Sequence, residues 1–245
     1  MNKKRQGIRR ALILISFLLF PVTLYYFSPV IIIMGVAEGV IAGCFIVFLL
    51  QFVTAFFLGR SFCGWLCAAA GLQEACFAAN DKKVSNRYNW VKYVIWIPWI
   101  TAIVVTCLSS GGLVKVDFFY RTRMGISVSA PKVYPIYLTV TGVIMILAFA
   151  IGRRAFCHYG CWMAPFMIIG TKLGSALRVP ALHLKARKEK CNECKRCTRN
   201  CPMSLDVDKM VLEGSMKHAE CILCANCIDN CPTGAIEYRF GARPQ

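Results

Sequence analysis

The sequence predicts a two-part membrane protein: a membrane all-α domain of four transmembrane helices, arranged as two pseudo-symmetric hairpins, and a small α+β domain behind it. Three observations lead to this fold class. Hydrophobic residues make up 57% of the chain and the mean hydropathy is +0.54, both higher than in soluble domains. Four long apolar stretches occur before residue 152. One cysteine spacing occurs twice in residues 191–245.

The four apolar stretches are expected to be transmembrane helices. They cover residues 11–34, 36–58, 90–108 and 133–151. Each reaches or nearly reaches the roughly 17–25 residues that a helix needs to cross a bilayer, and they show almost none of the polar stripe of a soluble helix. Pro21 and Pro29 leave a second interpretation of the first stretch open, a shorter helix followed by a re-entrant segment.

The distribution of Lys and Arg predicts the orientation. Basic residues are frequent in the N-terminal tail, after the second stretch and after the fourth, and none lies between the first and second stretches. The link between the third and fourth stretches is a weaker exception, with Lys115, Arg121, Arg123 and Lys132. By the positive-inside rule, both termini are expected in the cytoplasm, with a multi-pass domain in the inner (cytoplasmic) membrane. The net charge of +17 is attributed to this bias and to anionic lipid headgroups, not to nucleic-acid binding.

The repeated cysteine spacing predicts two iron–sulfur clusters. Each run reads C-x2-C-x2-C-x3-C-P, as in bacterial ferredoxins that carry two [4Fe–4S] clusters, where the fourth cysteine of each run ligates the other cluster. The predicted ligands are Cys191, Cys194, Cys197 and Cys231 for one cluster, and Cys221, Cys224, Cys227 and Cys201 for the other. Zinc is the alternative, but zinc sites require neither the third cysteine at fixed spacing nor the proline.

Domain boundaries follow from these patterns. The transmembrane domain is expected over residues 1–176, a basic linker over 177–189 and the cytoplasmic two-cluster domain over 190–245. The first run is flanked by charged residues such as Lys195 and Arg196, whereas the second is mainly apolar. We therefore expect the first-run cluster to be more exposed, to have the more positive potential and to face an acidic partner. A solvated surface is the other interpretation.

A second repeat marks the membrane domain. Residues 58–67 and 151–161 both read apolar-Gly-Arg, then Phe, then C-x3-C. Cysteines four apart share a helix face, so two halves related by a pseudo-twofold axis would bring four thiols together at the cytoplasmic membrane edge. These thiols belong to Cys63, Cys67, Cys157 and Cys161. They are predicted to hold an additional iron–sulfur cluster or a soft metal such as copper(I) or zinc, with redox-active thiols and simple packing left open.

Other residues near the cysteine pairs receive separate interpretations. Arg60, Arg153 and Arg154 would favour thiolates and offset their charge. Gln73 and Glu74 suit either proton transfer or the polar face of an interfacial helix. We interpret three groups as ordinary structural residues: Glu38 in a turn, His158 at the interface, and Cys44, Cys76 and Cys107 in packing.

Several of these motifs form a recognisable combination: Gly59-Arg60, Phe62-Cys63-Gly64-Trp65-Leu66-Cys67, Gly71-Leu72-Gln73-Glu74, Phe156-Cys157 with Cys161, and the double cysteine run. With them, residues from about 35 to 240 resemble the NapH/MauN-type 4Fe–4S membrane proteins, which include the membrane-bound C-terminal part of NosR and the CcoG proteins. That group commonly has C-x3-C-P, whereas Ala68 and Trp162 follow the pairs here. The resemblance implies a subunit that passes electrons between the membrane quinol pool, or a membrane redox partner, and other redox proteins.

Three classes of function remain. The leading prediction is a non-catalytic electron-transfer subunit, with membrane lipid, other redox subunits and quinol as the partners considered, and a quinol dehydrogenase role as the enzymatic variant. The alternatives are a copper reductase or metal-handling protein of the CcoG kind and a redox-sensing regulator. No C-x-x-C-H motif is present and the only histidines are His158, His183 and His218, so no haem is expected.

Overall fold

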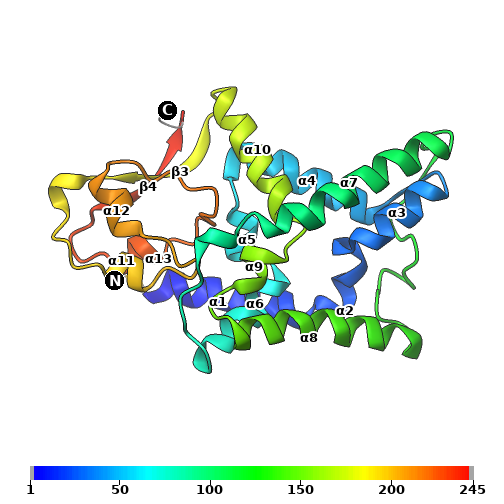
Figure 1. Ribbon diagram of the computed structural model, residues 1–245, viewed down its shortest axis with the longest axis horizontal. Helices are drawn as coiled ribbons and strands as arrows, with labels where there is room; N and C mark the ends of the chain where they lie inside the picture. Colours follow the sequence, from blue (N-terminus) through cyan, green and yellow to red (C-terminus); the bar gives the residue numbers. More distant parts are fainter. Residues whose placement is uncertain (1–2, 243–245) are drawn as a thin grey trace.

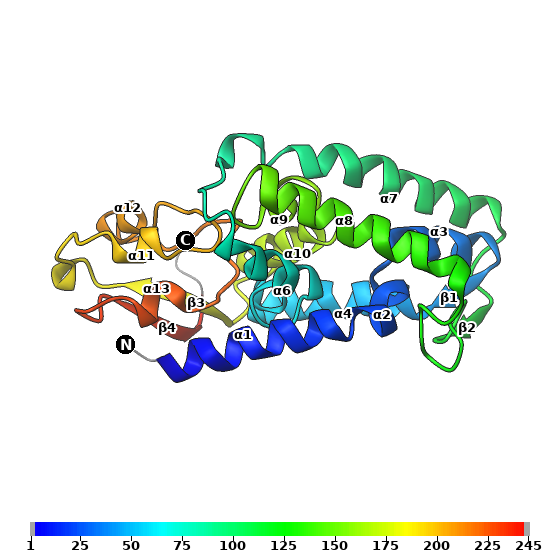
Figure 2. The same ribbon diagram turned by 90° about the horizontal axis from the view of Figure 1, so that it is seen from below.

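The computed structural model describes residues 3–242 and shows two parts along the long axis of the molecule (Figure 1). The larger part consists of the helices α1 to α10, and a smaller lobe at one end contains β3, β4 and three short helices. α1 begins beside the lobe and runs away from it along the helical part (Figure 2). The start of α1 therefore lies next to a lobe formed by residues after 180.

The helical part is built from long apolar helices and several short pieces. Its helices are α1 (Lys3–Leu18), α2 (Phe20–Thr23), η1 (Leu24–Phe27), α3 (Pro29–Ala37), α4 (Gly43–Leu58), α5 (Ser61–Trp65), α6 (Ala68–Ala75), η2 (Cys76–Ala78), η3 (Asn86–Tyr88), α7 (Val91–Ser109), η4 (Pro131–Val133), α8 (Tyr134–Ala150), α9 (Ala155–Tyr159) and α10 (Ala164–Ala176). A short parallel pair, β1 (Val40–Ala42) with β2 (Lys115–Asp117), lies at the end remote from the lobe.

Two helical segments are long and apolar enough to cross a membrane, judged by length and composition: Asn86–Ser109 and Pro131–Ala150. Within residues 3–242, a third span exists only if the bent pair Lys4–Leu18 and Phe20–Phe27 counts as one. α4 is apolar but has 16 residues. Of the four expected spans, the third and fourth are thus single long helices, the first is broken and the second is short.

The first apolar stretch is divided near its two prolines. α1 ends at Leu18, and the next helical piece is bent away from it by 57°. Pro21 lies in the first turn of α2 and Pro29 in the first turn of α3, where the missing N–H of proline costs nothing. Ser28 caps α3, because its Oγ accepts a hydrogen bond from the Ile31 N–H at 3.4 Å.

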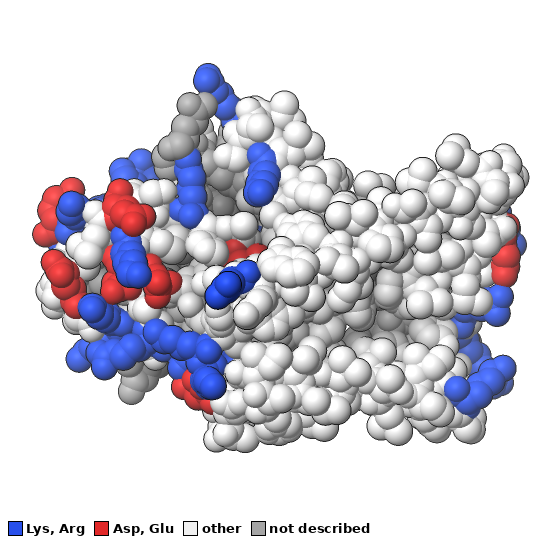
Figure 3. Space-filling model, in the orientation of Figure 1, with Lys and Arg blue, Asp and Glu red and all other residues white. Residues whose placement is uncertain are grey.

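Charged side chains are concentrated at the two ends of the molecule. On the face shown in Figure 3, Lys, Arg, Asp and Glu gather on the lobe and at the opposite end, and the middle is uncharged. Large apolar side chains are exposed along the helices between these ends, among them Leu138 and Ile146, each 64% exposed. An uncharged band between two polar ends is the surface that a bilayer requires.

The sequence repeat corresponds to a structural repeat. In each half a long helix, α4 or α8, is followed by a positive-φ glycine, a five-residue helix and a further helix. The glycines are Gly59 (φ 56°) and Gly152 (φ 128°). A β-carbon on Gly152 would lie 2.3 Å from the Lys82 carbonyl oxygen, so a side chain is excluded there. These glycines turn the chain from the long helices toward the lobe.

The lobe is a small α+β unit. Its elements are β3 (Ala181–Ala186), η5 (Lys188–Lys190), α11 (Arg196–Arg199), α12 (Val207–Leu212), α13 (Asn226–Asp229) and β4 (Ile236–Gly241). The strands are antiparallel, with Ala181 opposite Gly241 and Ala186 opposite Ile236. The expected linker over 177–189 therefore contains a strand of the lobe, because the alternating residues Leu182 and Leu184 pack on the lobe core.

Candidate iron–sulfur sites

One small cavity of the lobe is lined by the four cysteines of the first predicted ligand set, Cys191, Cys194, Cys197 and Cys231. Cys191 and Cys194 lie in the loop that enters α11, Cys197 lies in α11 itself, and Cys231 follows α13. Glu193 and Lys195 have left-handed backbones, with φ of 55° and 58°. Left-handed residues reverse the chain tightly, and here they wind the loop around the cavity.

A second cavity is lined by the other predicted set, Cys201, Cys221, Cys224 and Cys227. Leu223 and Ala225, at the positions equivalent to Glu193 and Lys195, are again left-handed, with φ of 49° and 62°. The two loops are therefore backbone copies of each other. In both cavities the fourth cysteine comes from the other run, which is the crossed grouping that the spacing predicts.

The donor set of each cavity fits an iron–sulfur cluster, since four thiols surround it and such clusters are held by four cysteine thiolates. Burial raises the pKa of Cys221 to about 11, which a bound metal would reverse. Burial also opposes ionisation of Cys231, but hydrogen bonds from Thr233 and from the Ala235 N–H outweigh it and lower the pKa of this thiol. Among residues 3–242, no three His, Cys, Asp or Glu side chains lie close enough together to hold a single metal ion.

The four membrane-edge cysteines lie near one another, although not as expected. Cys63 is in α5 and Cys157 in α9, whereas Cys67 is the N-cap of α6 and Cys161 lies between α9 and α10. The prediction that each pair shares a helix face is therefore wrong, because both five-residue helices end between the cysteines. The chain turns nevertheless bring the four thiols within electrostatic range of one another. Two of them, in Cys67 and Cys161, line a common cavity.

Polar and sulfur contacts fix two of these thiols. Gln73 is completely buried, and its Nε2 donates to Cys157 Sγ at 3.2 Å while its Oε1 accepts from the Phe156 N–H at 3.0 Å. Cys63 Sγ lies 3.5 Å from Met167 Sδ of α10. The interpretation of Gln73 as part of the polar face of an interfacial helix is wrong, because its side chain is buried against α9.

Two buried arginines occupy equivalent places in the repeat, three residues before Cys63 and Cys157. Arg60 pairs with Glu220 at 2.6 Å, and Glu220 also binds Lys92. Arg154 pairs with Glu74, which binds Arg9 at 2.7 Å. Arg154 also crosses to the other half, since its Nη1 donates to the Cys63 carbonyl at 2.8 Å. Each of the two groups thus holds two cations and one anion away from water.

The remaining sequence candidates have structural roles. Arg153 binds the exposed Asp81 and donates to the Arg199 carbonyl at 2.7 Å. Glu38 is an exposed turn residue paired with Arg121 at 2.8 Å, as expected. His158 is fully buried and its Nδ1 contacts Asn89 Oδ1 at 2.8 Å, so its interpretation as interfacial is wrong. Three cysteines pack in or against one apolar cluster of the helical part, Cys44, Cys76 and Cys107.

The second cysteine loop rests directly on the membrane-edge site. Trp65 Nε1 donates to the Leu223 carbonyl at 3.0 Å, and Gln6 of α1 donates to the Cys224 carbonyl at the same distance. A β-carbon on Gly64 would meet the Ile222 carbonyl, so the two backbones are in contact. Sequence reasoning did not single out Gln6, Lys92 or Glu220, because their partners lie more than a hundred residues away.

Comparison with known proteins agrees with both kinds of site. Residues 190–236 match the family described as a 4Fe-4S dicluster domain. Residues 41–85 and 134–180 both match the family described as a 4Fe-4S binding domain. The second match falls once on each half of the structural repeat and includes all four membrane-edge cysteines. Both parts of the chain thus match families described by 4Fe–4S binding.

Similar curated proteins include the uncharacterized protein MJ0749 of Methanocaldococcus jannaschii, which is 26% identical over 78% of this chain and 68% of its own length. YccM of Escherichia coli K12, named as a candidate electron transport protein, is 24% identical over 82% of this chain and 57% of its own. The regulatory protein NosR of Stutzerimonas stutzeri is 24% identical over 68% of this chain and 22% of its own length. The chain thus spans about half of YccM and about a fifth of NosR.

No solved structure matches the chain. The similarities support a membrane-type 4Fe–4S family with an electron-transport role. The particular relationship to NapH and MauN stays a prediction.

Proposed function

We propose that the protein is a membrane-anchored electron-transfer subunit that relays single electrons between a quinol or membrane redox partner and a redox protein at the lobe. The observation that carries the proposal is the seating of the Cys221–Cys224 loop on α5, the helix of Cys63. Clusters bound to the lobe cysteines would supply one-electron chemistry. The chain's own contribution is to hold the ligand sets at fixed places along one line from the membrane edge to the lobe surface.

The same proposal includes four membrane segments in the inner membrane with both termini and the lobe in the cytoplasm. The uncharged middle of the molecule and the charged lobe support this orientation (Figure 3). α1 supports it independently, because Arg5 and Gln6 bind Asp229 of the lobe and so place the N-terminal helix on the lobe's side. The bent first segment and the short α4 would then cross only with the help of neighbouring helices.

The buried charges support a dianionic centre at the four membrane-edge thiols. Each of the two buried groups has a net charge of +1: Arg60, Lys92 and Glu220, and Arg9, Arg154 and Glu74. Burying uncompensated charge costs several kcal/mol per ion. Four thiolates around an oxidised cubane core carry a net charge of −2, which would balance both groups. We therefore propose Cys63, Cys67, Cys157 and Cys161 as ligands of a third iron–sulfur centre.

The exit of the relay is proposed at the first cysteine loop. Cys191, Cys194 and Cys197 are all half-buried, whereas two of the three cysteines of the second loop, Cys224 and Cys227, are buried and only Cys221 is half-buried. Lys195 and Arg196 beside the first loop are exposed. An exposed loop with positive charge suits docking of an acidic redox protein.

Iron counting tests this arrangement. The protein would be purified anaerobically in parallel with a variant carrying Cys→Ser at the four membrane-edge positions, and with a control carrying Cys44→Ser, Cys76→Ser and Cys107→Ser. We expect more than about eight irons per chain in the parent and control, and about eight in the four-site variant, with matching EPR signals. Equal iron content in the parent, the control and the four-site variant would show that the four membrane-edge cysteines hold no iron–sulfur centre. Fewer than about eight in the parent would also reject the lobe assignment.

A second candidate function is supported by one contact. The Met167 thioether lies 3.5 Å from Cys63 Sγ, and a thiol with a thioether is a ligand combination that favours copper(I). On this alternative the membrane-edge thiols handle copper and the lobe supplies its electrons. Copper bound at equimolar amount by the parent, lost in the four-site variant and in Met167→Leu, would favour it over a third iron–sulfur centre.

A further inference from the structure

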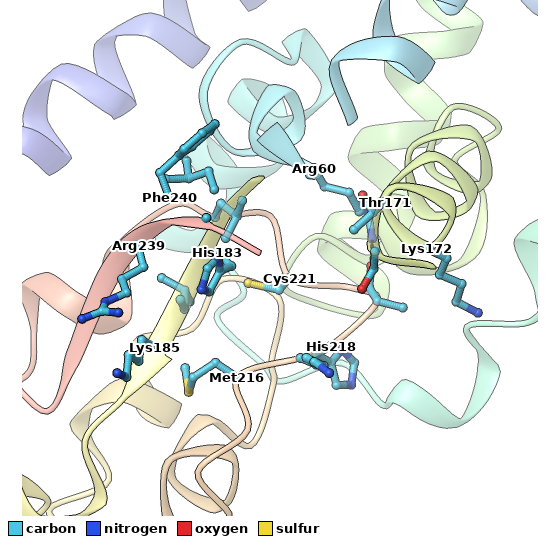
Figure 4. A pocket seen from close by; sticks show the side chains of 18 of the residues that line it. Arg60, Thr171, Lys172, His183, Lys185, Met216, His218, Cys221, Arg239 and Phe240 are labelled. Carbon is cyan, nitrogen blue, oxygen red and sulfur yellow. Dashed lines mark hydrogen bonds between the residues drawn. The ribbon is translucent and has the colours of Figure 1, made fainter. Parts of the chain in front are cut away.

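A large cavity lies between the lobe and the helical part, with the predicted cluster ligand Cys221 in its lining. Its volume is about 650 Å³, within the roughly 300–1,000 Å³ of small-molecule sites. α10 and the end of α4 form one wall, and β3, β4 and the loop before Cys221 form the opposite wall (Figure 4). A ligand in this cavity would touch both parts of the protein.

The lining of the cavity is cationic. Of the described residues that line it, none is Asp or Glu, and seven are basic or histidine: Arg60, Lys172, Lys185, Lys217, Arg239, His183 and His218. In Figure 4, Arg60 and Lys172 lie on the side of the helical part, and Lys185 and Arg239 on the side of the strands. The Arg239 Nε lies 3.8 Å from the carboxylate of Glu237, which is a long distance for an ion pair. Like charges facing each other across a cavity attract an anion.

The hydrogen-bonding state of Arg60, apart from its charge, is a second indication of an anion. Its side chain is 2% exposed, and its Nη1 donates to Glu220 and to the Ala219 carbonyl. Its Nε and Nη2 are buried and have no hydrogen-bond partner in the described structure. A buried donor without an acceptor is costly, and a guanidinium with two free N–H groups is suited to bidentate contact with an oxyanion.

Several of the other lining residues are apolar and suit the organic part of a ligand. Ile168, Leu182, Met216 and Phe240 contribute to the walls. We infer that this cavity binds a phosphate ester, with the phosphate among the basic side chains and the organic part against the apolar wall. The phosphate ester has two available sources. A phospholipid headgroup would enter along α10, where Leu173 and Leu177 are exposed, and a soluble phosphomonoester would enter from the cytoplasm.

The test compares the cluster-loaded protein in detergent with two triple variants that lose the same charge. The first carries Lys172→Gln, Lys185→Gln and Arg239→Gln in the cavity. The control carries Lys83→Gln, Arg87→Gln and Lys209→Gln, which are exposed and outside it. Binding of AMP is measured by equilibrium dialysis, and retained phosphatidylglycerol by native mass spectrometry after purification from membranes containing it.

Removing three cations from a phosphate site is expected to weaken binding by at least about 100-fold. AMP binding that is lost only in the cavity variant would support the proposal with a soluble ligand. Phosphatidylglycerol retention that is lost only in the cavity variant would support it with a lipid ligand. Equal behaviour of both variants in both assays would overturn it. These assays do not depend on electron transfer, so their outcome is separate from that of the proposed relay.

Discussion

Gly64 of α5 and Ile222 of the lobe are in backbone contact: a β-carbon on Gly64 would lie 2.4 Å from the Ile222 carbonyl oxygen. No side chain fits at that distance without moving the loop that carries Cys221 and Cys224. The contact therefore determines how closely the lobe approaches the membrane-edge cysteines, and several predictions depend on this approach.

Gly64→Ala is expected to displace the lobe from α5, because the added methyl group meets a backbone atom that has no freedom to rotate away. The lobe should become more sensitive to limited proteolysis near residues 177–190, and the thermal midpoint should fall. Gly142→Ala is the control, since a β-carbon there meets nothing within 4 Å. Equal protease sensitivity in the two variants would contradict the contact.

Glu220→Gln should strongly destabilise the junction between lobe and helices. The carboxylate is buried between Arg60 and Lys92, so its loss leaves two buried cations without a counter-ion, at a cost of about 3–5 kcal/mol. The measurement is the free energy of unfolding in detergent. Glu213→Gln, an exposed lobe residue, serves as the control. Adding Lys92→Met to Glu220→Gln should recover part of the loss, and a further loss instead would refute the charge argument.

The ion-paired carboxylate of Glu74 should make the stability of the protein fall at acid pH. Burial opposes its ionisation, but Arg154 and Arg9 outweigh burial and hold the pKa of this carboxyl at about 2. Its contribution to stability is therefore complete above the ordinary carboxyl pKa of about 4.3 and is lost as the pH falls toward 2, by about 1.4 kcal/mol per pH unit.

Thermal unfolding at pH 6, 4 and 3 checks this expectation. Glu74→Gln should be less stable than the parent at pH 6, yet its midpoint should fall less between pH 4 and pH 3. Parallel curves for the parent and the variant would show that Glu74 is not ionised in this range. The exposed Glu213→Gln should behave like the parent throughout.

The two lobe clusters should respond differently to surface charge. Lys195→Gln with Arg196→Gln removes two positive charges beside the Cys191 loop, which should make reduction of the first-run cluster harder and shift its potential to more negative values. The second-run cluster, buried under α5, should hardly change. An EPR-monitored redox titration measures both, with Lys83→Gln and Arg87→Gln as the control. Equal shifts of the two signals would contradict the proposed difference in exposure.

The parts of the site that depend on local spacing were predictable from the sequence. Two cysteine runs of identical spacing determined the crossed grouping around two cavities, since the loop geometry repeats with the spacing. The division of the first apolar stretch at Pro21 and Pro29 was also readable, because proline restricts the backbone wherever it occurs.

The parts that depend on distant partners were not predictable. Glu220 reads as an ordinary polar lobe residue, and only the fold shows that it neutralises Arg60, 160 residues earlier. The helix-face argument for Cys63 and Cys67 failed because α5 stops at Trp65, and a five-residue helix has no periodic signal to reveal its end. β3 was assigned to a linker because the basic stretch from Arg178 to Lys190 concealed a strand of six residues.

The N-terminal helix also implies an order of biosynthesis. Gln6 and Arg5 bind Asp229, more than 220 residues later in the chain. During translation these side chains are without their final partners until residue 229 has left the ribosome. The contact between the lobe and α1 therefore forms late, after all the helices of the helical part have been synthesised.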